Sequence, residues 1–308
     1  MARDVREIVV ISGKGGTGKT SIVAAFAGLA ENAVLADCDV DAADLHLILD
    51  PEVRERHDFS GGKLARVRSD DCIGCGRCAE VCRFGAVALN GVGNDVVGKT
   101  YVVDPVACEG CGVCVHFCPV QAIDFEEAIN GQWFISETRF GPMVHATLGI
   151  AEENSGKLVS LIRKEAKQLA ESQGRDLLIV DGSPGIGCPV IASISGADLV
   201  LVVTEPTLSG EHDLERVIDL AEHFGIAAMV CINKWDINAA IADRIEMKAA
   251  DRGVQVAGRI GYDAVVTKAQ VAGQSIAEYG DGPVRAAVVT LWETVRHELG
   301  KTGSSKEN

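Results

Sequence analysis

The sequence predicts an α/β fold in which a mostly parallel β-sheet is covered by helices on both faces, with a smaller α+β module inserted into it. Three observations lead to this prediction. Short, continuous apolar runs alternate with helical segments, a Gly-rich loop follows the first apolar run, and a cysteine-rich stretch interrupts the alternation. Apolar strands separated by helices are typical of parallel sheets that are buried on both faces.

The predicted strands and helices form two blocks on either side of the cysteine-rich stretch. The first block has strands at 8–12 and 33–37, each followed by a helix, at 20–31 and near 42–49. The second block alternates helices and strands: helix 156–173, strand 177–181, helix 190–195, strand 199–206, helix 209–224, strand 228–233, helix 239–252, strand 256–260 and helix 284–299.

Composition and charge restrict the possible partners. The chain has 308 residues, of which 47% are hydrophobic, and its formal net charge is -15. Such a charge repels nucleic acid and anionic lipid, so we expect neither to be a direct partner. The charged first residues lead straight into a strand, and no apolar run is long enough to span a membrane, so we expect a cytoplasmic protein.

The Gly-rich loop predicts a phosphate-binding site. Residues 13–20 read GKGGTGKT and match the pattern G-x-x-x-x-G-K-[ST] between a predicted strand and a predicted helix. Backbone N–H groups of such a loop wrap the phosphates, while Lys19 reaches the β- and γ-phosphates and Thr20 binds Mg²⁺. The predicted nucleotide-binding residues of the loop are Gly13, Lys14, Gly15, Gly16, Thr17, Gly18, Lys19 and Thr20.

The cysteines predict metal clusters. Eight of the eleven cysteines lie between residues 72 and 118, in two C-x2-C-x2-C-x3-C runs offset by 36 residues. These runs resemble those of bacterial two-cluster ferredoxins, in which the fourth cysteine of each run binds the other cluster. The resemblance implies cluster A on Cys72, Cys75, Cys78 and Cys118, and cluster B on Cys108, Cys111, Cys114 and Cys82. Zinc is the alternative, although its sites usually use separated cysteine pairs.

We therefore interpret the chain as one nucleotide-binding domain with an inserted ferredoxin-like module that carries two [4Fe–4S] clusters. The predicted boundaries are 1–62 and 132–300 for the two parts of the P-loop domain, 63–131 for the insert and 301–308 for a disordered tail.

Lys14 makes the loop similar to the deviant Walker A loop of the MinD/ParA superfamily, which includes Mrp-type cluster carriers and the nitrogenase iron protein. In these relatives the extra lysine contacts phosphates across a nucleotide-sandwich homodimer, so the resemblance implies an ATP-dependent homodimer and a catalytic role for Lys14 and Lys19. Asp39 matches the position that activates the attacking water, and Asp181 matches the Walker B aspartate; both are implied Mg²⁺ ligands beside Thr20.

The residues expected to recognise the base are compatible with either ATP or GTP. Asn233 follows the strand at 228–233, at the position where the family reads adenine. The same segment, Asn233 to Asp236, also resembles the N-K-x-D motif with which GTPases read guanine. We favour ATP, and keep GTP as the alternative.

Three other cysteines and one histidine have weaker interpretations. We expect Cys38 and Cys231 to be buried and inert. Cys188 lies seven residues after Asp181, the spacing of a cluster ligand in the nitrogenase iron protein, so a bridging cluster is an alternative to an inert thiol. No role is assigned to His145.

The combined motifs resemble MinD-superfamily ATPases that contain a ferredoxin insert, and they imply a P-loop ATPase that is slow without its partner. Our first hypothesis is that nucleotide binding and hydrolysis control electron transfer to a redox or metallocofactor-assembly protein. The alternatives are a Mrp-type cluster carrier and a MinD/ParA-like positioning ATPase. The C-terminal helix lacks the basic face with which MinD binds membranes.

Overall fold

The computed structural model describes residues 5–149 and 155–302, which divide into two compact units. The sheet unit contains the described residues of 1–57, 133–147 and 155–308. The cysteine unit contains those of 58–132 and 148–154. Two long strands, β3 (Glu52–Val67) and β6 (Ile123–Thr138), begin in one unit and end in the other.

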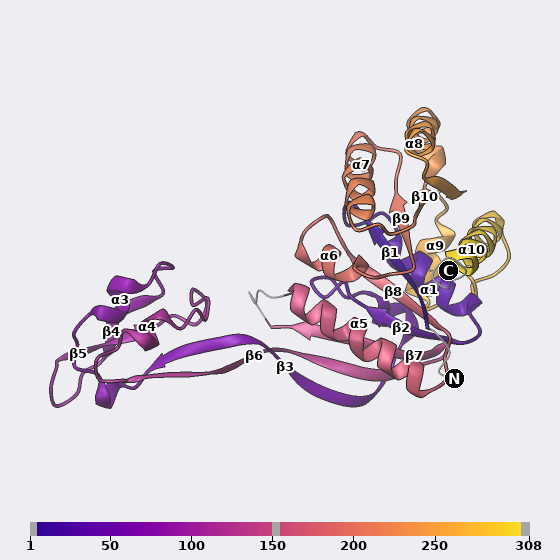
Figure 1. Cartoon of the computed structure of the whole chain (residues 1–308). Helices are drawn as coiled ribbons and strands as arrows, with labels where there is room; N and C mark the ends of the chain where they lie inside the picture. The colour runs from indigo at the N-terminus through magenta and orange to yellow at the C-terminus, as the bar shows by residue number, and fades with distance from the viewer. Residues whose placement is uncertain (1–4, 150–154, 303–308) are drawn as a thin grey trace. The chain divides into compact units, whose positions relative to one another are not determined.

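Within the described residues, nine strands form one sheet in the order β11-β10-β9-β1-β8-β2-β7-β6-β3 (Figure 1). Its centre is built from apolar strands that pair in parallel. The strands not yet named are β1 (Arg6–Ser12), β2 (Ala33–Asp37), β7 (Gly141–Leu148), β8 (Leu177–Pro184), β9 (Leu199–Thr204), β10 (Ala228–Asn233) and β11 (Gln255–Ile260). The predicted α/β fold with a mostly parallel sheet is therefore confirmed.

Helices cover both faces of the sheet because alternate residues of each strand point to opposite sides. Ile8 and Val10 of β1 pack in one core cluster with α1 (Lys19–Leu29) and α10 (Pro283–Thr302). The other helices of the sheet unit are α2 (Leu45–Leu49), α5 (Ser155–Ser172), α6 (Cys188–Ile194), α7 (Leu208–His223), α8 (Ala239–Asp251), α9 (Val265–Val271) and the 3-10 helix η2 (Trp235–Ile237). Right-handed crossovers place α5, α6, α7 and α8 on the face opposite α1.

The parallel arrangement gathers the carboxyl ends of six strands at one edge of the sheet. Residues that follow or end these strands are Lys14 after β1, Asp39 after β2, Asp181 in β8, Glu205 after β9, Asn233 in β10 and Gly261 after β11. Because ligands of α/β proteins bind at this edge, the fold itself brings the candidate residues of distant segments together.

The cysteine unit is built from short elements around a small apolar core. Its elements are η1 (Ser69–Asp71), α3 (Arg77–Val81), β4 (Val87–Val92), β5 (Lys99–Val103) and α4 (Val113–His116), together with parts of β3 and β6. β4 and β5 pair as an antiparallel two-stranded sheet. Ala65, Cys78, Cys114 and Ile123 form the buried core.

The structure differs from the sequence predictions at two places. The predicted strands did not include β3 and β6, two sixteen-residue strands on either side of the cysteine runs. Helix α10 continues through Thr302, into the predicted tail, and the rest of that tail lies outside the described residues. None of the helices in the described part of the chain combines the length and apolar character that a membrane span requires.

Candidate nucleotide site and cysteine-lined cavities

The loop between β1 and α1 has the conformation that its glycines allow. Gly16 and Gly18 have φ values of 80° and 92°, in the left-handed region that favours glycine. A Cβ atom at Gly18 would also clash with the amide nitrogen of Asn233. That nitrogen donates a hydrogen bond to the Thr17 carbonyl at 2.7 Å, so β10 holds the loop in place.

Lys19 lies buried between two carboxylates at the start of α1. Its Nζ is 2.5 Å from Asp181 Oδ1 and 3.1 Å from Asp39 Oδ2, and its side chain is 5% exposed. Burial alone would lower the pKa of the Lys19 ammonium, but the charges of Asp181 and Asp39 raise it above its ordinary value. Lys19 therefore stays protonated and available to an anionic phosphate.

The three aspartates of this region form an acidic cluster with unsatisfied oxygens. Burial and the neighbouring charge of Asp181 raise the pKa of Asp37 well above its usual range, and burial also raises the pKa of Asp39. Asp37 Oδ2, Asp181 Oδ2 and Thr17 Oγ1 are buried and have no hydrogen-bond partner among residues 5–149 and 155–302. Orphaned buried oxygens are costly unless a ligand satisfies them, and hard oxygen ligands suit Mg²⁺. The residues present therefore fit a Mg²⁺-nucleotide.

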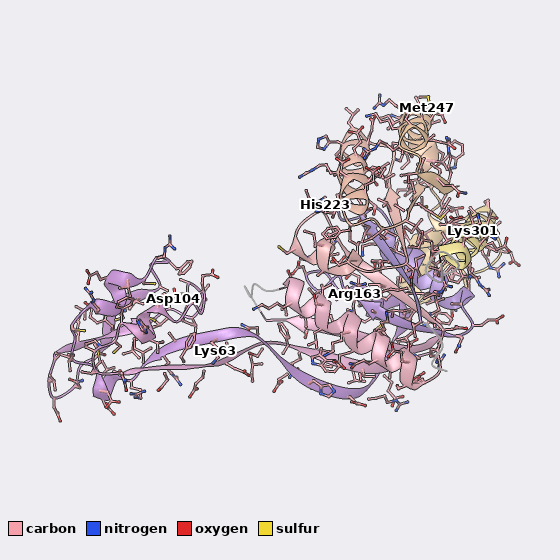
Figure 2. The ribbon with its side chains drawn as sticks, in the orientation of Figure 1. Lys63, Asp104, Arg163, His223, Met247 and Lys301 are labelled. Atoms are coloured by element: carbon pink, nitrogen blue, oxygen red, sulfur yellow. The ribbon has the colours of Figure 1, made fainter. Side chains whose placement is uncertain are left out.

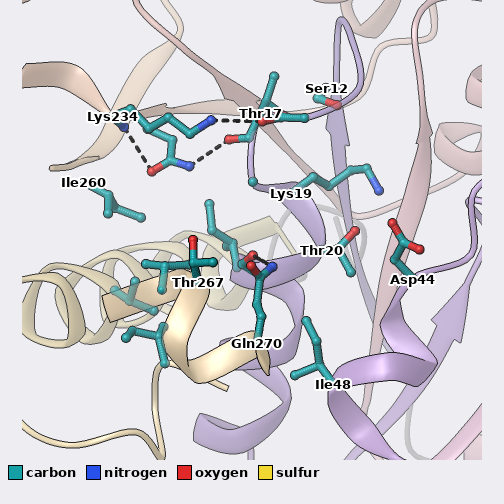
Figure 3. A pocket seen from close by; sticks show the side chains of 18 of the residues that line it. Ser12, Thr17, Lys19, Thr20, Asp44, Ile48, Lys234, Ile260, Thr267 and Gln270 are labelled. Atoms are coloured by element: carbon teal, nitrogen blue, oxygen red, sulfur yellow. Dashed lines mark hydrogen bonds between the residues drawn. The ribbon is translucent and has the colours of Figure 1, made fainter. Parts of the chain in front are cut away.

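A cavity of about 650 Å³ opens beside this cluster. Its lining includes residues 15–22 of the loop and α1, Asp39, and Asn233 and Lys234 at the end of β10. Figure 3 shows Thr17 and Lys234 on one side of the cavity and Thr267 and Gln270 of α9 on the other. The loop contributes polar groups to the lining, and α9 and α10 contribute apolar side chains, which suits a ligand with a charged end and a flat, less polar end.

The structure separates the two candidate base-reading residues. Asn233 lines the cavity, whereas Asp236 is not among the lining residues. Asp236 Oδ1 instead accepts a hydrogen bond from the Tyr262 backbone N–H at 2.7 Å. One of the oxygens that a guanine reader would use is thus already engaged with the backbone.

Lys14, the extra lysine of the loop, forms an ion pair within the chain. Its Nζ is 2.5 Å from Glu205 Oε1 and within hydrogen-bond distance of Ser209 and Thr207. Lys234 Nζ lies 3.3 Å from the second oxygen of Glu205 and donates to the Gly16 carbonyl at 3.0 Å. The pKa of Glu205 is lowered: its burial acts in the opposite direction, but the two lysines outweigh it.

Sequence reasoning missed Glu205 and Lys234. A signal for Glu205 exists, because it directly follows the buried strand β9, as Cys38 and Asp39 follow β2. Charged residues at the carboxyl ends of parallel strands face the ligand edge of the sheet. Applying that rule to every strand would have selected Glu205.

The eight clustered cysteines line two separate cavities in the cysteine unit. The first is lined by Cys72, Cys75, Cys78 and Cys118, and the second by Cys82, Cys108, Cys111 and Cys114. Each cavity therefore contains three cysteines of one run and the fourth cysteine of the other run. This is the crossed grouping that the ferredoxin resemblance implies.

The surroundings of the thiols suit cluster binding. Each cavity has apolar neighbours, including Ile73 and Val120 in the first and Phe84 and Val113 in the second. Burial raises the pKa of the Cys78 thiol to about 11, so this thiol keeps its proton at neutral pH unless a bound metal stabilises the thiolate. The Ala122 N–H donates to Cys118 Sγ at 3.3 Å, a hydrogen bond that also favours a thiolate.

The remaining residues of interest lie elsewhere. Cys38 and Cys231 are fully buried, as predicted, and burial raises the pKa of the Cys231 thiol to about 12. Cys188 is exposed at the start of α6, and its alternative role as a cluster ligand stays a prediction. His145 of β7 is hydrogen-bonded to Ser136 and stacked on Phe134.

Comparison with known proteins adds to this geometry. Residues 8–276 match the family described as the CobQ/CobB/MinD/ParA nucleotide binding domain. The chain belongs to this family. An uncharacterized protein of Methanocaldococcus jannaschii is 33% identical over 237 residues, which are 76% of this chain and 80% of the relative.

Two further similarities bear on the two units of this MinD/ParA-family protein. An uncharacterized ferredoxin of Methanocaldococcus jannaschii is 40% identical over 57 residues, which are 18% of this chain and 70% of the ferredoxin. The septum site-determining protein MinD from Pyrococcus horikoshii, solved with Mg-ADP, has a TM-score of 0.57 at 16% identity. That comparison covers 97% of this chain and 98% of the MinD chain, and it shows a shared fold.

Proposed function

We propose that this protein hydrolyses ATP with Mg²⁺ and uses the nucleotide to control electron transfer from two [4Fe–4S] clusters to a protein partner. The observation that carries the proposal is the crossed grouping of the eight cysteines around two cavities, in a chain of a nucleotide-binding family. Ferredoxin-type clusters with cysteine ligands from both runs are electron carriers.

The cysteine geometry favours clusters over zinc. Each cavity is lined by three cysteines of one C-x2-C-x2-C-x3-C run and by the fourth cysteine of the other run. This is the ligand set of a two-cluster ferredoxin, whereas zinc sites usually use separated cysteine pairs.

The acidic cluster supports hydrolysis of the nucleotide. In the proposed site Thr20, Asp39 and Asp181 hold Mg²⁺, which would neutralise charge on the phosphates. Lys19 leaves Asp39 and Asp181 to bind the β- and γ-phosphates, and Asp39 orients the attacking water. Lys14 completes the site of a second copy of the chain, so the active form is a homodimer. Asn233 lines the cavity where the base would lie, which supports ATP.

Coupling between nucleotide and clusters requires little energy. Shifting a one-electron potential by ~100 mV takes about 2.3 kcal/mol, within the 1–3 kcal/mol that is usual for allosteric coupling. The chain offers a covalent route, since β3 starts shortly after the Asp39 segment and continues into the cysteine unit.

The deciding experiment is an anaerobic redox titration, followed by EPR, of protein whose iron has been counted. It is run without nucleotide, with MgADP and with a non-hydrolysable MgATP analogue. We expect about eight irons per chain and midpoint potentials that shift by tens of millivolts when the analogue binds, with no shift in the Lys19→Met variant. Eight irons and unchanged potentials in every state would contradict nucleotide control.

One observation favours a second candidate, delivery of clusters to other proteins. Each cavity has one exposed ligand, Cys75 in the first and Cys111 in the second, where an acceptor thiol could begin exchange. Incubating the loaded protein with an apo-ferredoxin distinguishes the two functions. A carrier loses iron to the acceptor as nucleotide is hydrolysed, whereas an electron-transfer protein keeps it.

A further inference from the structure

The turn that joins β4 and β5 is organised by one side chain, that of Asn94. Asn94 Oδ1 accepts hydrogen bonds from the backbone N–H groups of Val96 at 2.9 Å and Val97 at 3.0 Å. The Asn94 N–H in turn donates to the Val97 carbonyl at 2.9 Å. The oxygen of the side chain is therefore used to close the turn.

The amide nitrogen of the same side chain reaches a different segment. Asn94 Nδ2 donates to the Ser69 carbonyl at 2.6 Å and to the Cys72 carbonyl at 2.8 Å, with a longer contact of 3.5 Å to the Asp70 carbonyl. Cys72 is the first cysteine of the first run. A half-buried amide that uses both its donors and its acceptor is held in one orientation.

The hairpin contacts the first cysteine loop at two more points. Gly74 has a φ of 65°, and a Cβ atom there would lie 3.1 Å from the Val97 side chain. A Cβ atom at Gly76 would lie 2.9 Å from the Tyr101 hydroxyl. The β4–β5 hairpin thus follows the loop from Cys72 to Gly76 at close range.

The second cysteine loop is supported differently. Gly110 packs against the backbone of Lys63 on β3, which Figure 2 labels, and Gly112 packs against the Phe125 ring of β6. Because the two cysteine runs are offset by 36 residues, Asn130 stands at the position of the second repeat that is equivalent to Asn94. Asn130 Oδ1, however, accepts a hydrogen bond from the Gly61 N–H of β3. Among the hydrogen bonds of the described residues, an amide side chain donates to a cysteine carbonyl at the first loop alone.

We propose that Asn94 is a positioning residue for cluster A: it holds the Cys72 segment in the geometry that the cluster requires, and cluster B does not depend on it. Hydrogen bonds that fix the segments bearing metal ligands typically change metal affinity tenfold to a hundredfold. The inference rests on the proposed presence of two clusters, and it adds an asymmetry between them that the repeated cysteine runs do not contain.

The test uses the full chain, purified without oxygen, in three variants. Asn94→Ala removes every contact of the side chain, whereas Asn94→Asp keeps the acceptor for Val96 and Val97 and loses the donors to Ser69 and Cys72. Asn90→Ala, an exposed asparagine of β4, is the matched control. Each protein is treated with an iron chelator, then with an alkylating agent, and the modified cysteines are mapped by mass spectrometry.

In both Asn94 variants we expect the cysteines of cluster A to become alkylated on the order of tenfold faster than in the unchanged protein. Those of cluster B keep their protection, and the EPR spectrum of the reduced protein changes from two interacting clusters to one isolated cluster. Asn90→Ala behaves like the unchanged protein. Nucleotide binding, measured in parallel, reports that the sheet unit is folded, and the protection of cluster B reports that the cysteine unit is folded.

The outcomes separate this inference from the proposed function. An unchanged protein that binds no iron after reconstitution would contradict the clusters themselves. An unchanged protein with both clusters, and Asn94 variants that lose the two at equal rates or lose neither, would overturn the role of Asn94 alone. An Asn94→Asp variant that retains cluster A would also overturn it, because the donated bonds would then not matter.

Discussion

Lys14 and Glu205 form an ion pair within one chain, with Lys14 Nζ 2.5 Å from Glu205 Oε1. Glu205 also pairs with Lys234, whose Nζ donates to the phosphate-binding loop. If Lys14 contacts the nucleotide of a second chain, as the family resemblance implies, it must first leave Glu205. The carboxylate then competes with the phosphates for the same ammonium group.

The first prediction is that Glu205→Gln promotes dimerisation. The ion pair between Lys14 and Glu205 is partly exposed, so it stabilises the monomer by at most about 1 kcal/mol. Its loss would change the dimerisation equilibrium constant by roughly fivefold. We expect the variant to form dimers at a several-fold lower concentration of a non-hydrolysable ATP analogue, measured by sedimentation velocity. Glu215→Gln, which removes a different ion pair with Lys248, is the control. Dimerisation of Glu205→Gln at unchanged or higher analogue concentrations would show that this pair does not restrain Lys14.

The second prediction concerns Asp39, whose carboxylate pairs with Lys19 at 3.1 Å. Asp39→Asn keeps the size of the side chain but removes the charge that, in the proposed function, orients and activates water. General-base groups typically contribute 10²- to 10⁴-fold to a rate, so we expect ATP hydrolysis to fall by at least about 10²-fold. Binding of a fluorescent ATP analogue changes far less. Asp41→Asn, which changes an exposed carboxylate that does not line the cavity, is the control and keeps its activity.

The third prediction concerns Gly18. Its φ of 92° is costly for any other residue, and a Cβ atom there would clash with the Asn233 amide. Gly18→Ala therefore combines backbone strain of about 1–3 kcal/mol with the loss of the hydrogen bond from Asn233 to Thr17. We expect a lower free energy of unfolding in urea without nucleotide. Gly15→Ala, where a Cβ atom meets nothing within 4 Å, is the control, and equal losses in both variants would contradict this explanation.

Most of the sheet unit could be predicted because its signals are local. The run at 33–37 became β2 and the run at 228–233 became β10 without any change of boundary, since each is a continuous apolar segment. β3 was missed for the opposite reason. Most of its side chains are exposed and many are charged, so it has no apolar run to detect. Its pairing with distant residues, rather than its own sequence, makes it a strand.

The candidate site also contains residues that could be predicted from the sequence and residues that could not. The loop at 13–20 has a motif with a known geometry, so its residues could be named from sequence. The pairing of Lys14 with Ser209 joins residues 195 apart, and no spacing rule connects them. Asn94 could not be predicted for another reason. Its side chain binds the backbone carbonyl groups of Ser69 and Cys72. Every residue has such a carbonyl group, so only the folded chain shows which of them lie within reach of Asn94.

The fourth prediction concerns the pH dependence of stability through His145. Burial lowers the pKa of His145 to about 4, and the nearby charge of His46 acts in the same direction. An unfolded histidine titrates near 6.5. Between pH 6.5 and 4 the unfolded chain therefore binds more protons than the folded one, and the unfolding free energy falls as the pH falls. We expect His145→Gln to remove roughly 1–2 kcal/mol of the difference between pH 7.5 and pH 5. Urea unfolding followed by tryptophan fluorescence measures it.

The control for this prediction is His223→Gln, which changes an exposed histidine at the end of α7 (Figure 2). The pH dependence of its unfolding free energy is compared with that of His145→Gln. Glutamine at 145 can keep a hydrogen bond to Ser136, so the variant tests the proton rather than the contact. A pH dependence that is equal in His145→Gln and in the unchanged protein would show that His145 remains accessible to protons in the folded chain.

The fifth prediction tests the crossed grouping of the cysteines. Cys118 belongs to the second run in sequence but lines the first cavity with Cys72, Cys75 and Cys78. A cluster bound by only three thiolates readily loses one iron. Cys118→Ser should therefore destabilise cluster A, whose other three ligands come from the first run. We expect Cys72, Cys75 and Cys78 to become open to alkylation, while Cys108, Cys111 and Cys114 stay protected.

Cys82→Ser is the reciprocal variant, and its pattern should be the inverse, because Cys82 lines the second cavity. The two variants together distinguish crossed from sequential ligation without any assumption about the redox potentials. If Cys118→Ser instead exposed Cys108, Cys111 and Cys114, each run would hold its own cluster. The grouping around the two cavities would then describe only the packing of the thiols, and the main support for ferredoxin-type clusters would be lost.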